Sequence, residues 1–199
     1  MIKNLTFDGK AETLCATLYG EFESKRKVIL SPPHPLLGGC RCDLRVVAVA
    51  RELHENGISA LCIDYRKNYG GGLGEIEDLR SAIDFFEPDK RKKLGLFGYS
   101  FGSLVASNID DERVKGIVLI SVLSKMGEIA VKVDTTYKKL FIHGRRDYIA
   151  PYDEFLEIYN DSLGEKYCKV YDTDHFYAGF MEEVKGEVSK FFLKVFEDY

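Results

Sequence analysis

Hydrophobic and polar residues alternate with a period of two along the first twenty positions. Ile2–Phe7 and Thr13–Tyr19 both show this pattern, and the pair Asp8-Gly9 between them is typical of a tight turn. These residues predict an antiparallel hairpin. After a polar stretch, Val28–Leu30 predicts a short buried strand that ends in a proline-rich loop.

Beyond that loop, helical and strand patterns alternate. The expected strands are Ile58–Ile63, Leu94–Phe97, Val114–Ile120, Leu140–Ile142 and Tyr167–Tyr171. The expected helices are Asp43–Asn56, a helix striped by Ile76, Leu79, Ile83 and Phe86, Ser100–Asn108, a helix that begins at Pro151, and a C-terminal helix striped by Val184, Val188, Phe191 and Val195. Repeated units of this kind predict a mostly parallel, doubly wound sheet with helices on both faces. Ligands bind beyond the carboxyl ends of such strands.

Composition limits the class of protein. The 199 residues suit one α/β domain, 1–199, and a hydrophobic fraction of 45% excludes a disordered chain. The formal net charge of −4 gives no reason to expect nucleic acid as a partner. No apolar run approaches the roughly 20 residues of a membrane span, and the first residues lack the apolar core of a signal peptide. We therefore expect a cytoplasmic protein that does not enter membranes.

Five cysteines, an odd number, do not form a secreted disulfide framework. Cys40 and Cys42 form a lone C-x-C with no second Cys/His pair nearby, so a zinc site is not expected. The redox state of these two residues stays open.

The strongest chemical signal is Gly98-Tyr99-Ser100-Phe101-Gly102, a G-x-S-x-G sequence between an expected strand and an expected helix. In this context the motif predicts a nucleophile elbow, a tight turn that lifts the Ser100 hydroxyl above the sheet. Glycines flank the turn because a Cβ there would collide with neighbouring backbone. The alternative interpretation is a serine that caps the following helix.

A serine hydroxyl needs a base, and the base needs an acceptor that orients it. His175 follows the last expected strand and is the best base; His54 lies in a helix, and His143 at a strand end is more typical of a structural residue. Asp147 follows the Leu140–Ile142 strand, at the same edge of the sheet. The order serine, aspartate, histidine is that of α/β-hydrolases.

An oxyanion hole should combine the backbone N–H after the nucleophile with one from a loop after an early strand. Phe101 supplies the first donor. For the second we predict Leu36, with Leu37 behind it, because Pro35 has no N–H. His34 is interpreted as a scaffold for this loop.

The stretch Ser121–Lys139 is too short for a helical cap over the site. We therefore expect an open, shallow, apolar groove, which favours short acyl esters. Its expected substrate-binding residues are Leu37, Tyr99, Met126 and Phe176.

These residues resemble a known family. The matching pieces are PPHPLLGG, ALCIDYRKNYGGGLGEIEDLRSAIDFF, GYSFG, GRRDYIAP and DTDHFY, which span nearly the whole chain. They are similar to small lidless α/β-hydrolases of prokaryotes, which are related to dienelactone hydrolases and carboxylesterases. The resemblance implies the triad Ser100, Asp147 and His175, with Leu36 and Phe101 as oxyanion donors, and ester hydrolysis without a cofactor.

The chain departs from that family in two places. Arg66 is followed by Lys-Asn-Tyr and three glycines instead of an Arg-Gly-x-Gly-x-S-x-G type of loop. The nucleophile is serine, unlike the cysteine of dienelactone hydrolases, so that particular activity is not implied.

The sequence thus predicts a serine hydrolase that cleaves a small-molecule carboxylic ester through an acyl-serine intermediate. A thioesterase or a peptidase of the same fold is the alternative within the enzymes, and a non-catalytic binding protein is the alternative outside them. The oligomeric state, a homodimer included, is left open.

Overall fold

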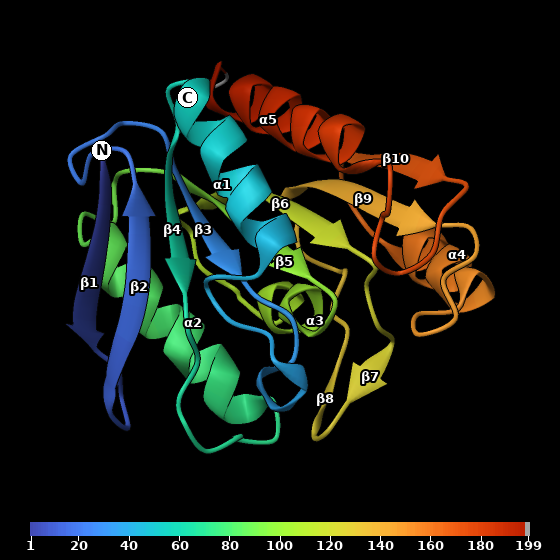
Figure 1. Ribbon diagram of the computed structural model, residues 1–199, viewed down its shortest axis with the longest axis horizontal. Helices are drawn as coiled ribbons and strands as arrows, with labels where there is room; N and C mark the ends of the chain where they lie inside the picture. The colour runs from blue at the N-terminus through green and yellow to red at the C-terminus, as the bar shows by residue number, and fades with distance from the viewer. Residues whose placement is uncertain (198–199) are drawn as a thin grey trace.

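A computed structural model describes residues 1–197 and contains one eight-stranded sheet in the order β1-β2-β4-β3-β5-β6-β9-β10 (Figure 1). Its strands are β1 (Ile2–Asp8), β2 (Thr13–Tyr19), β3 (Lys27–Ser31), β4 (Ser59–Ile63), β5 (Leu94–Tyr99), β6 (Val114–Ile120), β9 (Lys138–Gly144) and β10 (Lys166–Tyr171). Strands β1 and β2 pair antiparallel, β2 joins β4 antiparallel, and the strands β4, β3, β5, β6, β9 and β10 run parallel to one another. The predicted hairpin and the predicted parallel sheet are both confirmed.

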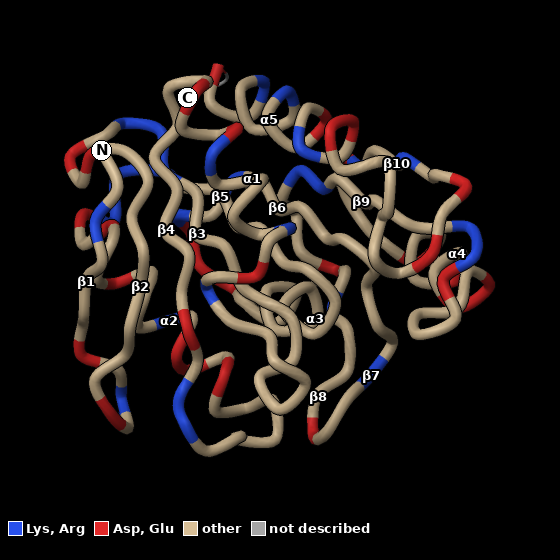
Figure 2. The backbone as a smooth tube through the Cα atoms, in the orientation of Figure 1, with Lys and Arg blue, Asp and Glu red and all other residues tan. Residues whose placement is uncertain are grey.

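Helices cover both faces of the sheet. One face carries α1 (Leu44–Glu55) and α5 (Met181–Glu197), and the other carries α2 (Leu73–Phe86), α3 (Phe101–Ser107) and α4 (Tyr152–Asp161). Each helix turns an apolar stripe to the strands, so the sheet lies between two separate hydrophobic cores. Figure 2 shows acidic and basic residues interleaved around the backbone, as along α5. No described helix has the length and apolarity that crossing a membrane requires.

The segment between β6 and β9 contains a feature that the sequence did not predict. Two short strands, β7 (Lys125–Met126) and β8 (Ile129–Ala130), pair antiparallel there. The hairpin packs on the glycine-rich loop at Gly70–Gly72, since the Glu128 N–H donates to the Gly71 carbonyl at 2.8 Å. Two-residue strands carry too little alternation to be recognised in a sequence. A hairpin of this size is not a cap domain.

A buried ion pair lies at the amino end of the central strands. The Lys27 Nζ is 3.0 Å from a carboxylate oxygen of Glu87, and both side chains are 2% exposed. The same ammonium donates to the Phe86 carbonyl at 2.7 Å. This pair joins the start of β3 to the end of α2, far from the carboxyl ends where a ligand is expected.

Replacing Lys27 with Met should leave the Glu87 carboxylate buried without a counter-ion. We expect the free energy of unfolding to fall by about 3–5 kcal/mol, measured by urea denaturation near neutral pH. The double variant Lys27→Met/Glu87→Leu removes both charges and should recover most of that loss. A single variant as stable as the wild type would contradict this account of the pair.

Candidate active site

The turn from β5 into α3 positions Ser100. Its backbone has φ 55° and ψ −120°, outside the regions that L-residues normally occupy. The turn brings backbone segments too close together for side chains. A Cβ on Gly98 would lie 2.3 Å from the Gly102 carbonyl oxygen, and a Cβ on Gly102 would lie 2.2 Å from the Ser31 carbonyl oxygen. Glycine is required at both positions, and the strained serine is held at the carboxyl end of β5.

Three side chains from three strand ends meet at this turn. The Ser100 Oγ is 2.9 Å from His175 Nε2, and His175 Nδ1 is 2.8 Å from Asp147 Oδ2. All three residues are buried, with Ser100 the most accessible at 8%. The Ser100 hydroxyl makes no capping hydrogen bond to α3, so the helix-cap interpretation does not account for it. The sequence-predicted residues are thus hydrogen-bonded in the predicted order.

The carboxylate of Asp147 receives four hydrogen bonds. Its Oδ1 accepts the backbone N–H groups of Ile149 at 2.9 Å and Ala150 at 2.8 Å. Its Oδ2 accepts from His175 and from the Ser121 hydroxyl, the latter at 2.7 Å. Burial raises the pKa of Asp147, but these donors outweigh it and hold the pKa below its usual range. Asp147 therefore stays ionised beside the imidazole.

His143, the other histidine near this edge, has a structural role as predicted. Its ring is fully buried and stacks on Phe155, and Nε2 is 2.9 Å from the Ala150 carbonyl oxygen. Burial lowers the pKa of His143, so the ring is a neutral donor that fixes the turn carrying the Asp147 amide partners.

Tyr99 does not line an open groove, which corrects the sequence prediction. Its ring is 1% exposed, and its hydroxyl donates to the backbone carbonyl of His175. The Arg45 guanidinium donates to the same hydroxyl at 3.0 Å and is itself paired with Asp43. The residue before an elbow serine ends its strand facing the protein interior, so Tyr99 supports the histidine loop from beneath.

The predicted oxyanion donor Leu36 is also corrected. Its N–H already donates to His34 Nδ1 at 3.2 Å, and the Leu37 N–H donates to the His34 carbonyl at 3.0 Å. Both bonds belong to a 3₁₀ turn, η1 (Pro35–Leu37), that begins at His34. Among residues 32–39, the His34 N–H has no acceptor within the described part of the chain, whereas the prolines carry no N–H and the leucine and glycine amides are hydrogen-bonded.

His34 belongs to the same cluster as the elbow. Its ring centroid lies 4.7 Å from that of Phe101 and 4.6 Å from that of Tyr69. Burial lowers the pKa of His34, which keeps Nδ1 free to accept from Leu36. The Phe101 N–H at the start of α3 is likewise without an acceptor among the described residues.

The other predicted substrate-binding residues differ in position. Leu37 is 83% exposed and Phe176, next to His175, is 46% exposed, both at the carboxyl edge of the sheet. Met126 lies on β7 and packs on the apolar core.

The sequence reasoning missed Ser121 and Tyr177, which contact each other at 2.8 Å behind the acid. Ser121 directly follows β6, and this position after a predicted strand is the signal that could have indicated it.

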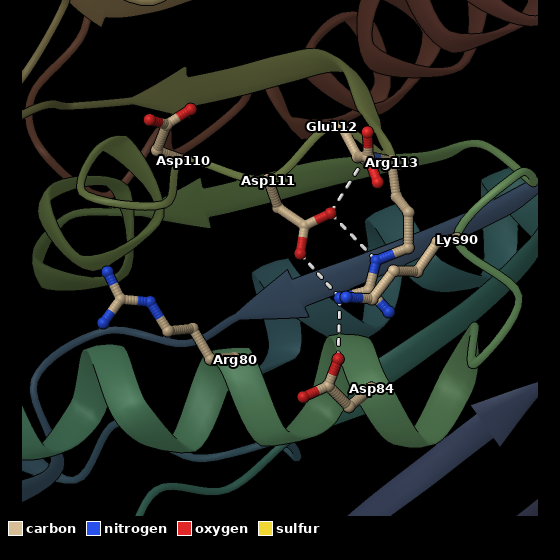
Figure 3. A pocket seen from close by; sticks show the side chains of 7 residues that line it. All are labelled: Arg80, Asp84, Lys90, Asp110, Asp111, Glu112 and Arg113. Carbon is tan, nitrogen blue, oxygen red and sulfur yellow. Dashed lines mark hydrogen bonds and ion pairs between the residues drawn. The ribbon is translucent and has the colours of Figure 1, made fainter.

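A charged cavity of about 310 Å³ lies at the opposite end of the sheet (Figure 3). There Arg113 pairs with Asp84 at 2.7 Å and with Asp111 at 2.6 Å, and it is 4% exposed. These pairs tie α2 to the start of β6. Among residues 1–197 there is no group of three or more His, Cys, Asp or Glu side chains arranged to hold a metal ion.

No protein-family model and no curated protein matches the chain. Among solved structures it is similar to a serine hydrolase homologue from Coxiella burnetii, with a TM-score of 0.83, 20% identity and coverage of 94% of this chain and 96% of that one. It is also similar to a serine hydrolase without a lid from Xanthomonas campestris (TM-score 0.75, 20% identity, 95% and 92% covered). A third similar structure is an esterase from Pyrococcus furiosus, with a TM-score of 0.82, 19% identity and coverage of 98% of this chain and 91% of that one. The chain thus has the lidless α/β-hydrolase fold, as predicted.

The elbow geometry predicts that Gly102→Ala is strongly destabilising. The added Cβ would overlap the carbonyl oxygens of Ser31 and Pro32, at 2.2 and 2.5 Å, and we expect a loss of about 2–3 kcal/mol in unfolding free energy. Gly186→Ala is the matched control, because its Cβ meets nothing within 4 Å in the middle of α5. That variant should gain about 0.5–1 kcal/mol. Equal denaturation midpoints for the two variants would contradict the close approach.

Proposed function

We propose that this protein is a serine hydrolase that cleaves carboxylic esters through an acyl-serine intermediate. The observation that carries the proposal is the continuous chain from Ser100 Oγ to His175 at 2.9 Å and from His175 to Asp147 at 2.8 Å. Both distances are those of hydrogen bonds, and the serine hydroxyl is not used for capping. The similarity to solved serine hydrolases supports the proposal at the level of fold.

The residues suit two half-reactions. His175 Nε2 takes the proton of Ser100 as Oγ attacks the ester carbonyl, and the tetrahedral intermediate collapses when His175 returns the proton to the leaving alkoxide. Water then attacks the acyl-serine with the same base, which releases the acid and restores the hydroxyl. Asp147 remains ionised throughout and stabilises the imidazolium.

For the oxyanion hole we propose the backbone N–H groups of Phe101 and His34. Neither amide has an acceptor within residues 1–197, and the two residues are in ring contact. The loop that carries His34 also packs against α3 at Gly102. Two free backbone N–H groups beside a nucleophile are the kind of donors that stabilise a developing oxyanion.

The proposed substrate class is a short acyl ester. The exposed leucines of the η1 loop and the half-exposed Phe176 ring offer apolar surface at the edge of the sheet, without a cap domain to enclose a long chain. A thioesterase or a peptidase would use the same residues, and a panel of p-nitrophenyl esters, acyl-CoAs and aminoacyl amides separates the three activities. For the location we propose the cytoplasm; all five cysteines are free thiols.

A fluorophosphonate probe tests the nucleophile. We expect the wild-type protein to be labelled at Ser100 and Ser100→Ala to remain unlabelled, as read by intact mass and peptide mapping. The control is Ser107→Ala, which should label like the wild type. Ser107 is a buried serine on α3, and its hydroxyl donates to the Leu104 carbonyl. A wild-type protein that resists the probe would favour a non-catalytic binding protein.

Two substitutions at one position test the His34 amide. His34 has φ −62°, which proline adopts without strain, so His34→Pro removes the N–H while His34→Ala removes only the ring. We expect kcat on a p-nitrophenyl ester to fall about 100- to 1,000-fold further in the proline variant than in the alanine variant. Equal kcat values in the two variants would exclude this amide as a donor.

A further inference from the structure

Two hydroxyl groups outside the triad lie directly behind its acid. Ser121 follows β6, and Tyr177 lies two residues beyond His175; both are fully buried. The Ser121 Oγ is 2.7 Å from Asp147 Oδ2 and 2.8 Å from the Tyr177 hydroxyl. Two further polar side chains are therefore hydrogen-bonded behind Asp147, and neither takes part in the proposed proton transfers.

Each of the two hydroxyl groups carries one proton, which determines the donor in each hydrogen bond. Asp147 is ionised and accepts, so the single proton of Ser121 points to Asp147. The Tyr177 phenol proton is then the only one left for two acceptors, the Ser121 Oγ at 2.8 Å and the Ile142 carbonyl oxygen at 3.1 Å, and it is shared between them, with the shorter contact to Ser121. Burial raises the pKa of Tyr177 well above its usual value, so the phenol keeps its proton. The order is Tyr177 to Ser121 to Asp147.

The backbone shows that both residues are held in place. Ser121 has φ 47° and Tyr177 has φ 56°; with Ser100 they are the non-glycine residues of positive φ in the described chain. The Ser121 N–H donates to the Ile142 carbonyl at 2.9 Å, and the Tyr177 hydroxyl donates to the same oxygen at 3.1 Å. Ser121, through its backbone N–H, and Tyr177, through its hydroxyl, are thus both anchored to Ile142 on β9, two residues before the end of the strand that leads to Asp147.

We propose that Ser121 and Tyr177 are positioning residues that disperse the negative charge of Asp147 through a two-hydroxyl chain and so set the pH at which the Asp147–His175 pair takes up a proton. The proposal rests on the proposed function for its catalytic consequence. With Ser121 in place, part of the carboxylate charge is taken up by its hydroxyl. Without it, more of that charge is directed at the imidazolium, so the pair holds its proton to higher pH.

The direct test is an NMR pH titration of the His175 ring in the full-length protein. We expect the midpoint of Ser121→Ala to rise by about one pH unit over the wild type, and that of Tyr177→Phe to rise by less. Since Tyr177 acts through Ser121, the double variant should match Ser121→Ala rather than sum the two shifts. The pH dependence of fluorophosphonate labelling should move in the same direction, with labelling at the acid end slowed about tenfold in Ser121→Ala.

Ser189→Ala is the matched control. Ser189 is a buried serine on α5 whose hydroxyl has no hydrogen-bond partner among residues 1–197, so its loss should leave the titration at the wild-type midpoint. An unchanged midpoint in Ser121→Ala, or additive shifts in the double variant, would overturn the proposal. If Ser121→Ala does not fold, the test rests on Tyr177→Phe, and an unchanged His175 midpoint in that variant would also overturn the proposal. The titration needs no substrate, so an unlabelled wild-type protein would refute the proposed function separately.

Discussion

The parallel sheet is the constraint on which the rest of the molecule depends. Parallel strands end at one edge, so residues far apart in the chain come together wherever each follows its strand. Ser100 follows β5, Asp147 lies beyond β9, and His175 lies beyond β10. The sheet brings these three chain segments to one edge, and the Tyr99 hydroxyl, which donates to the His175 carbonyl, then holds the histidine loop in place. The sharp turn at Ser100 is the added requirement, and two glycines meet it.

Buried charge is stabilised in different ways at the two ends of the sheet. At the amino end, Lys27 is paired with Glu87, and Lys139 donates to three backbone carbonyls. At the carboxyl end, Asp147 has no cation of fixed charge beside it and is stabilised by four hydrogen-bond donors. An ion pair fixes structure, whereas a carboxylate held by neutral donors remains available to a transient imidazolium.

Sequence patterns predicted the sheet, the hairpin and the triad because each depends on local features: periodicity, a glycine-flanked serine and the position of residues after strands. The second oxyanion donor could not be predicted in this way. The Leu36 amide is used within a 3₁₀ turn, where it donates to the His34 ring, and a turn of three residues leaves no periodic pattern in the sequence. Tyr99 shows the same limit, since its burial depends on partners far away in the sequence, the His175 carbonyl and the Arg45 guanidinium. The β7–β8 hairpin was too short to leave a pattern.

The proline-rich loop after β3 has a consequence for the thermodynamics of catalysis. Three of the five prolines in the chain lie at positions 32, 33 and 35, on both sides of His34. Each ring fixes a φ angle in the unfolded chain as well as in the folded one, so little conformational entropy is lost when the loop is ordered. In the proposed oxyanion hole, a rigid loop of this kind would place the His34 amide before substrate arrives and would need no rearrangement as charge develops. Rate acceleration at this loop should therefore appear as a lower activation enthalpy rather than as a change in activation entropy.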